Sequence, residues 1–432
     1  MRKIEITSPV NPAMVTESLP RAVVTIDSVQ EVVSQIIAEV KDQSIAALTS
    51  HAEKFDGLVD IDFRVPKTEL VAALQEMDPE LRAAIEVAIS RVRKVSEATV
   101  PSELTVELDS GAQVTQKFVP VASVGLYVPG GKAVYPSSVV MNVVPAQVAK
   151  VPRIAVTSPA QKDGLPSRSV LATCELLGID EVYAMGGASA VAAFAYGIPE
   201  IDLEPVAMVT GPGNIFVAAA KRQLRGVIGI DSEAGPTEIL IIADQTANPE
   251  FVAADLISQA EHDPNAAAVL VTDSPALIVA VEQALDKQIP LAANHSRISQ
   301  ALAGIQSALV LVDSIESAIQ VANAYATEHL EIHCADSQAV ASQITNAGAV
   351  FIGEYSPVSL GDYLAGSNHV LPTGEQAKFS SGLGVATFLR SQQHINYSKQ
   401  GLKSVVDSLV KFSEAESLSA HGRAGAIRFE EQ

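Results

Sequence analysis

Apolar positions in the first hundred residues repeat at the spacing of α-helices. Ser28 and Glu31 form a capping box, and apolar residues follow at helical intervals. They are Val29, Val32, Ile36, Ile37 and Val40. A second helix is predicted after Asp78-Pro79, because a capping residue followed by a first-turn proline is a preferred order. Its apolar stripe consists of Leu81, Ile85, Ile89 and Val92, so both helices are predicted to pack against a larger body.

From residue 114 onward, short β-rich runs alternate with helical runs. A first series of predicted strands lies at residues 121–128, 153–157, 181–185, 206–210 and 227–230. A second series lies at residues 238–244, 268–272, 308–312, 329–333 and 349–352. Strands that alternate with helices are typical of parallel sheets. The sequence therefore predicts an α/β fold with two doubly wound parallel-sheet, Rossmann-like domains and helical N-terminal elements.

The alternation breaks after Leu371-Pro372, where polar and Gly/Ser-rich sequence leads to a final helix near residues 402–418. This extended C-terminal tail is too short to form its own core, so we expect it to lie across another surface. The expected division is an N-terminal extension (1–25), a first α/β domain (26–126 with 237–372), a second α/β domain (127–236) and the tail (373–432).

Composition places the chain among globular proteins. With 432 residues, 48% of them hydrophobic, it can form two or three domains with large cores. The net charge of -21 argues against nucleic acid or an anionic membrane surface as a partner. Cys174 and Cys334 lie in apolar runs, which indicates buried thiols in a reducing compartment, the cytoplasm. The N-terminus lacks a signal-peptide core, and no apolar stretch reaches the length that spans a bilayer.

Gln259 and His262 stand three residues apart at the end of a helix-patterned run that begins near Asn248. If the helix continues to His262, both side chains lie on one face and can hold one ion together, with Pro264 ending the helix. This is half of a metal site, because catalytic zinc takes three protein ligands and an open position. The plainer interpretation is a histidine at a helix end beside a surface glutamine.

Three glycine-rich turns follow predicted strands of the first series. They are Pro129-Gly130-Gly131, Gly186-Gly187-Ala188-Ser189 and Gly211-Pro212-Gly213-Asn214. None is a complete dinucleotide fingerprint, since Phe216 stands where the last of them needs a third glycine. Each is also explained as a tight turn. Open α/β sheets bind ligands at the carboxyl ends of their strands, however, so three such turns favour a cofactor site in this domain.

Titratable residues gather in the second series. Glu328 and His329 stand together at the start of a strand and offer an acid/base pair that works near neutral pH, although a single strand histidine is more often structural. Asp362 lies in a polar region after the last strand, at an expected strand carboxyl end, where a carboxylate can reach a metal. Glu416 and His421 close the terminal helix, where a histidine is ordinarily solvated.

Taken together, these stretches resemble the histidinol dehydrogenase family over nearly the whole chain. The motifs that carry the resemblance are KFDG at 54–57, VGLYVPGG at 124–131, GPGN at 211–214, AGPTE at 234–238, SQAEH at 258–262, EHL at 328–330, GD at 361–362, SNHVLP at 367–372 and the stretch from Ala415-Glu416 to His421. That family oxidises a primary amino alcohol to the amino acid in two NAD-dependent steps, with one zinc per site in a homodimer. The resemblance therefore implies oxidation of L-histidinol through the aldehyde to L-histidine, in histidine biosynthesis.

The resemblance also implies a role for each matching residue. The implied zinc ligands are Gln259, His262, Asp362 and His421, the last one reaching in from the partner subunit. In the implied scheme, His329 takes the alcohol proton as hydride leaves for NAD, and Glu328 activates water on the aldehyde. The implied NAD contacts are Tyr127, Ser189 and Asn214, and the implied substrate contacts are Thr237, Gln259, His262, His329, Asp362, Glu416 and His421.

Four positions depart from the residues usual in that family. Ser189 replaces Gln, Thr237 replaces Ser, Thr327 replaces a Pro before the Glu-His pair, and Glu233 replaces a common Pro. The methyl group that Thr237 adds is worth about 1 to 3 kcal/mol of discrimination between related alcohols. A second interpretation is therefore a zinc- and NAD-dependent relative that acts on another primary alcohol, such as a sulfonated diol. A third, a non-catalytic zinc- or nucleotide-binding module, leaves the Glu-His pair without a role.

Overall fold

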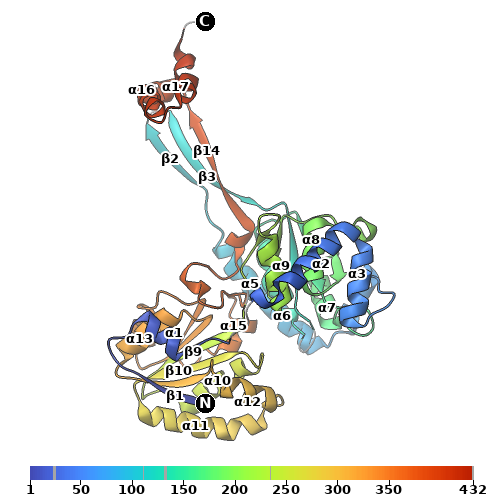
Figure 1. The fold of residues 1–432 in the computed structure, drawn as a ribbon, viewed down its shortest axis with the longest axis vertical. Helices are drawn as coiled ribbons and strands as arrows, with labels where there is room; N and C mark the ends of the chain where they lie inside the picture. The colour runs from blue at the N-terminus through green and yellow to red at the C-terminus, as the bar shows by residue number, and fades with distance from the viewer. Residues whose placement is uncertain (23–25, 110, 131–133, 234, 431–432) are drawn as a thin grey trace.

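The structure is a computed structural model that describes residues 1–22, 26–109, 111–130, 134–233 and 235–430. Gly131 and Ala234, which belong to two of the motifs above, lie outside these ranges. Figure 1 shows two α/β domains and a long arm that projects away from both of them. Within the described ranges, no helix is long and apolar enough to cross a membrane.

Sheet A is a six-stranded parallel sheet with the order β1-β11-β10-β9-β12-β13. Its strands are β1 (Arg2–Ile6), β9 (Glu238–Ala243), β10 (Ala267–Thr272), β11 (Ala308–Val312), β12 (His329–His333) and β13 (Ala349–Ile352). Helices cover both faces, so its central strands are apolar on both sides and appear in the sequence as unbroken hydrophobic runs.

The helices of sheet A divide between its two faces. The helices on one face are α1 (Pro12–Ser18), α13 (Ile315–Tyr325) and α14 (Ser337–Ala341). The helices on the other face are α10 (Pro249–Ala260), α11 (Pro275–Gln288), α12 (His295–Ala303) and α15 (Val358–Tyr363). The N-terminal segment thus belongs to this domain, because β1 pairs with β11 along the whole strand.

Sheet B is a five-stranded parallel sheet with the order β6-β5-β4-β7-β8. Its strands are β4 (Ser123–Tyr127), β5 (Arg153–Ser158), β6 (Val182–Ala184), β7 (Met208–Thr210) and β8 (Gly229–Ile230). Counted along the chain from β4 and from β9, both sheets have the strand order 3-2-1-4-5 of doubly wound folds, with β1 added to sheet A. The predicted fold class is confirmed.

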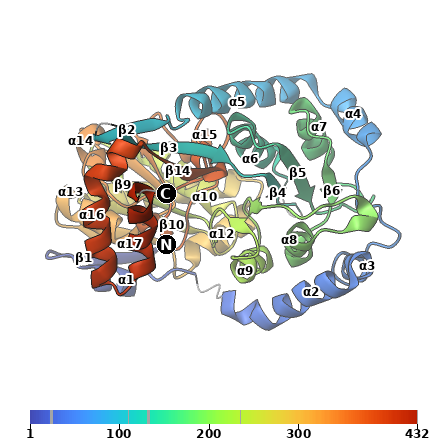
Figure 2. The same cartoon turned by 90° about the horizontal axis from the view of Figure 1, so that it is seen from above.

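Helices from the N-terminal part of the chain pack on both faces of sheet B (Figure 2). One face is covered by α4 (Lys67–Glu76), α5 (Pro79–Ala98), α6 (Pro136–Val148) and α7 (Arg168–Leu176), and the other by α2 (Gln30–Gln43), α3 (Ile45–His51), α8 (Gly187–Tyr196) and α9 (Ile215–Leu224). The expected division joined residues 26–126 to sheet A. The packing differs, because the apolar stripes of α2 to α5 are buried against sheet B and its helices.

The arm is an antiparallel sheet with the order β14-β3-β2, and two helices lie at its outer end (Figure 1). Its elements are β2 (Leu104–Asp109), β3 (Ala112–Pro120), β14 (Leu389–Tyr397), α16 (Lys399–Ala415) and α17 (Ser419–Ala426). The sequence predicted a tail from residue 373 onward, but not that β14 of this tail pairs with β3 over nine residues. The arm is therefore built from two segments that lie far apart in the chain, residues 104–120 and 389–426.

Candidate active site

A cavity of about 1000 Å³ lies between the two α/β domains. Tyr127 and Gly211, at the carboxyl ends of β4 and β7, line one side of it. Glu238 and His329, at the amino ends of β9 and β12, line the other side. One cavity is thus bounded by the carboxyl edge of sheet B and the amino edge of sheet A.

Glu328 and His329, the predicted acid/base pair, are buried beside this cavity and fixed by hydrogen bonds. Oε2 of Glu328 accepts from the Thr237 hydroxyl at 2.5 Å and from the backbone N–H of Glu238 at 3.0 Å. Nδ1 of His329 lies 3.1 Å from the backbone oxygen of Glu238, an acceptor, so this nitrogen carries the proton. The lone pair is therefore on Nε2 of His329, which is buried and has no hydrogen-bond partner among the described residues.

Burial shifts the proton affinities of this pair in opposite directions. It raises the pKa of Glu328 well above its usual value, although the hydrogen bonds from Thr237 and Glu238 oppose that shift. Burial lowers the pKa of His329, so the ring is neutral at physiological pH. A neutral imidazole with a free nitrogen can accept a proton, and a carboxylate with a raised pKa is a stronger base toward water.

Two of the four implied zinc ligands, His262 and Asp362, line this cavity, and a third, Gln259, contacts Thr237 in the cavity wall. His262 Nε2 lies 3.8 Å from Asp362 Oδ2, a spacing that one ion between them can bridge. Gln259 is 1% exposed and donates its amide N–H to the Thr237 hydroxyl at 2.6 Å, so its amide oxygen remains as the metal-binding atom. Burial also lowers the pKa of His262, which favours the neutral, metal-binding form. The donor set therefore fits zinc with one position still to be filled.

Two details of this ligand set differ from the sequence-based expectation. The α10 helix ends at Ala260, so His262 lies beyond the helix rather than on its face. Asp362 was expected at a strand carboxyl end. It lies instead near the amino edge of sheet A, because α15 runs back along the sheet after β13 and brings it to His262.

Glu416 and His421, the remaining implied residues, lie elsewhere. Both are exposed at the outer end of the arm, one just after α16 and the other in α17 (Figure 1). The arm carries them away from the two domains, and so away from the cavity between those domains. Within one chain, the fourth ligand position of the site is therefore not filled by His421.

His369 is a site residue to which the sequence assigned no role. Its Nδ1 lies 3.0 Å from the backbone oxygen of Asp362, and its Nε2 lies 3.1 Å from the Ser138 hydroxyl. Burial lowers its pKa, so the neutral ring can donate to the Asp362 oxygen and accept from Ser138. It holds the backbone at a predicted metal ligand, and its only sequence signal was its place in the motif at 367–372.

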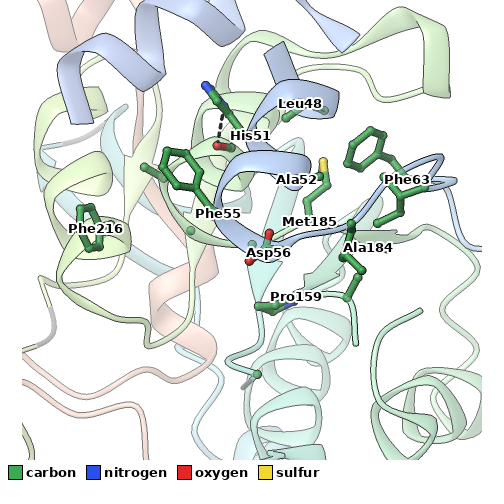
Figure 3. Close-up of a pocket in the computed structure, with 18 of the residues that line it drawn as sticks. Leu48, His51, Ala52, Phe55, Asp56, Phe63, Pro159, Ala184, Met185 and Phe216 are labelled. Carbon is green, nitrogen blue, oxygen red and sulfur yellow. Dashed lines mark hydrogen bonds between the residues drawn. The ribbon is translucent and has the colours of Figure 1, made fainter. Parts of the chain in front are cut away.

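The three predicted nucleotide contacts line a second cavity of about 610 Å³ (Figure 3). The Tyr127 hydroxyl accepts from the N–H of Gly187, and Asn214 caps α9 by accepting from two backbone N–H groups. Both of these residues also line the larger cavity, so the two cavities adjoin. Gly211 permits the close approach of β4 and β7 here, since its φ is +111° and a Cβ would lie 2.1 Å from the Tyr127 oxygen.

Ser189, which stands where the family usually has glutamine, takes part in a chain of hydrogen bonds that leads from the buried Ser189 and His51 to the partly exposed Glu39. Its hydroxyl lies 2.9 Å from Nδ1 of His51, and Nε2 of His51 lies 2.7 Å from a Glu39 carboxylate oxygen. His51 projects from α3 into this cavity (Figure 3). No sequence pattern pointed to His51, because its partner Ser189 is 138 residues away.

The other three departures lie near the larger cavity or its walls. Thr237 bridges Gln259 and Glu328 through its hydroxyl, a role that serine also fulfils. Glu233 forms an ion pair with Arg222 at 2.6 Å. The Thr327 hydroxyl is buried without a hydrogen-bond partner among the described residues, and nothing in the structure explains the substitution.

Comparison with known proteins agrees with the site. Residues 19–429 match the sequence model of the histidinol dehydrogenase family. The chain is 56% identical over 420 residues to histidinol dehydrogenase of Thermobifida fusca, covering 97% of this chain and 95% of that protein. It is 54% identical over 416 residues to that of Leifsonia xyli, covering 96% and 95%. The crystal structure of histidinol dehydrogenase from Elizabethkingia anophelis matches with a TM-score of 0.94 at 33% identity, covering 99% of this chain and 98% of that one. The chain therefore belongs to the histidinol dehydrogenase family of oxidoreductases.

Proposed function

We propose that this enzyme oxidises L-histidinol through the amino aldehyde to L-histidine, in histidine biosynthesis, with NAD as oxidant and one zinc ion per site. The observation that carries the proposal is the meeting of Glu328 and His329 with two zinc-type donors, His262 and Asp362, beside one cavity. The cavity lined by the predicted nucleotide contacts opens beside it, as transfer between substrate and cofactor requires. Bound NAD would accept a hydride in each step, and bound zinc would polarise the substrate oxygen.

In the first oxidation, the protein must remove the proton of the alcohol hydroxyl. His329 suits this task because its free Nε2 points into a buried site and its Nδ1–H is held by the Glu238 backbone. The hydroxyl proton passes to Nε2 while the carbon-bound hydrogen leaves with its electron pair. Burial keeps the imidazole neutral beforehand, so it is ready to accept.

In the second oxidation, water must add to the aldehyde carbon before another hydride can leave. Glu328 suits this task because its raised pKa makes the ionised carboxylate a stronger base toward water. The Thr237 and Glu238 donors to Oε2 hold the carboxylate in one orientation. The water oxygen forms the new bond to carbon, and its proton passes to the carboxylate.

We further propose that two chains form a homodimer in which His421 and Glu416 of one arm complete the site of the other chain. The arm leaves apolar side chains exposed, as a surface that a second copy covers would do. On its strands these are Leu104, Val106, Leu108 and Ile395, which are 46–70% exposed. On α16, Phe412 is 72% exposed.

The location proposed for such a biosynthetic enzyme is the cytoplasm, in line with its two unpaired cysteines. NADH formation, followed by absorbance with purified protein, zinc and L-histidinol, tests the proposed activity. Two NADH per histidinol consumed is the expected yield, because the oxidation removes four electrons. Rapid turnover of a sulfonated diol with none of histidinol would instead identify the relative that acts on another primary alcohol. No NADH from either substrate by zinc-loaded, dimeric protein would contradict a redox function.

A further inference from the structure

A second polar cluster is buried in the domain of sheet A, deeper than the catalytic residues. Glu331 and His333 follow His329 along β12 at alternate positions, so all three point to the same face of the sheet. That face lies toward α10, because Leu330 and Ile332 pack into the apolar cluster on the opposite face. The strand thus carries a stripe of three titratable residues inward from the active site.

Asp255 on α10 completes this cluster from the facing helix. It lies one turn before Gln259, so the two residues share a helix face. Nε2 of His333 lies 3.4 Å from Oε2 of Glu331 and 3.7 Å from Oδ2 of Asp255. Metal-ligating atoms of the three side chains all lie within 4.8 Å of one another.

These distances are those between neighbouring ligands of one small cation. Bonds of about 2.0–2.2 Å in a tetrahedral arrangement place adjacent ligand atoms about 3.3–3.6 Å apart. The donors, one imidazole nitrogen and two carboxylate oxygens, are ligand types that zinc accepts. Direct hydrogen bonds from His333 would instead bring Nε2 to about 2.7–3.0 Å from these oxygens. Asp255 and Glu331 share a hydrogen bond with each other, so one of the two carboxyl groups carries a proton that a bound ion would displace.

The cluster also lacks the partners that buried polar groups normally have. Glu331 is 0% exposed and His333 is 3% exposed. Yet Oε2 of Glu331 and both ring nitrogens of His333 have no hydrogen-bond partner in the part of the chain that the structure describes. Over those same ranges, neither Asp255 nor Glu331 forms an ion pair with a lysine or arginine. Such groups are costly to bury unless something else satisfies them.

The charge balance of the cluster suits a divalent cation. Burial raises the pKa of Asp255 to about 8 and that of Glu331 to about 7, and the negative charge of Glu331 adds to the rise for Asp255 while His333 opposes it. Burial lowers the pKa of His333, which leaves the ring neutral with a lone pair to donate. Two carboxylates and a neutral imidazole would neutralise a doubly charged ion, and the bound ion would take the place of the protons that the carboxyl groups hold.

We propose that Asp255, Glu331 and His333 bind a second zinc-class divalent cation, distinct from the ion assigned to the catalytic cavity. His333 is the last residue of β12, the strand next to β9 in sheet A. That is the carboxyl edge of the sheet at its topological switch point, where doubly wound sheets commonly hold ligands. The catalytic cavity uses the opposite edge, so this place is free for a separate ion.

The ion would have a structural effect on the active site. It joins α10 to β12, and these two elements carry Gln259 and His329. The loop at 353–357 lies beside the cluster. In that loop Gly353 donates to the backbone of β12, and Glu354 adds negative charge near His333. This second site does not depend on the proposed reaction.

Metal content of the purified full-length protein tests the proposal. The protein is loaded with zinc, passed through a desalting column, and its zinc is measured per chain by atomic emission. We expect about two equivalents in the wild type and about one in His333→Gln. His394→Gln is the matched control, because it removes a histidine that is exposed on β14 and remote from both sites, and it should keep about two.

Further variants separate this inference from the proposed catalytic zinc. His262→Ala should keep the zinc equivalent held by Asp255, Glu331 and His333. If His333→Gln does not fold, Asp255→Asn takes its place as the test variant and should lose that equivalent. A wild type with one equivalent that survives His262→Ala and vanishes in Asp255→Asn would support this site and contradict the catalytic one. A wild type with no more than one equivalent, lost in His262→Ala, would overturn the second site.

Discussion

Thr237→Val tests whether the hydroxyl of Thr237 tunes Glu328 as the base of the second oxidation. Valine keeps the shape of the side chain but removes the 2.5 Å donation to the Glu328 carboxylate. Among the interactions that lower the pKa of Glu328, this hydrogen bond is the largest. Because the bond stabilises the ionised form, its loss raises the pKa further, and the ascending limb of the pH profile moves to higher pH.

The size of the rate change follows from the strength of a buried hydrogen bond to a charged group. A buried hydrogen bond to a charged group contributes about 1.5–3 kcal/mol, so the rate on the ascending limb should fall by about 10- to 150-fold. The rate should recover at high pH, where Glu328 is ionised in both proteins. The assay is the initial rate of NADH formation from the amino aldehyde as a function of pH, at saturating NAD.

Two controls make this result specific. Thr237→Ser keeps the hydroxyl and should retain the wild-type pH profile. Zinc content must be measured in both variants, because the same hydroxyl accepts from Gln259 at 2.6 Å. A Thr237→Val enzyme that keeps its zinc and shows the wild-type pH profile would refute the assignment of Glu328 as the base tuned by this bond.

Three further predictions concern the roles of the site residues. His262→Ala should lose the catalytic zinc and the activity while the far-ultraviolet circular dichroism stays unchanged; a variant that keeps both zinc equivalents would show that the ligand assignment is wrong. Glu328→Gln should slow aldehyde oxidation more than alcohol oxidation, by about 10²–10⁴-fold, and His329→Asn should slow alcohol oxidation more than aldehyde oxidation. The two half-reactions are measured separately, and equal, mild effects of both substitutions on both steps would count against these roles. The His329→Asn and His421→Ala proteins should each be nearly inactive alone, and after their subunits exchange the mixture should recover up to about a quarter of wild-type activity. The reason is that half of the random dimers are mixed, and each mixed dimer has one intact site out of two. A mixture that stays inactive after proven exchange would exclude a shared site.

The sheets of both domains could be predicted from the sequence because their strands are covered on two faces. Such strands need apolar side chains at every position, and the run at residues 238–243 is an example. The arm was missed because its strands have no such requirement. All six residues of β2 are exposed, and the partner of β3 is a strand about 270 residues later in the chain.

The same distinction applies to the site. Glu328 and His329 were found because they are adjacent in the sequence and belong to one motif, EHL at 328–330. The contacts that give them their properties are not local, since Thr237 lies 91 residues from Glu328. The position of Asp362 was misjudged for a similar reason. Its distance from the sheet edge depends on the direction of α15, which the sequence pattern does not specify.

The use of opposite sheet edges also determines the electrostatic polarity of the cavity walls. On the side of sheet B, helix α9 begins at the cavity, with Asn214 as its cap, so the positive end of the helix dipole faces inward. On the side of sheet A, α10 and α13 end just before His262 and Glu328, so their negative ends face inward. A dinucleotide pyrophosphate is favoured at the first wall, and a metal cation or a protonated amine at the second. The backbone alone thus orients an anionic cofactor and a cationic substrate toward each other across one cavity, before any charged side chain contributes.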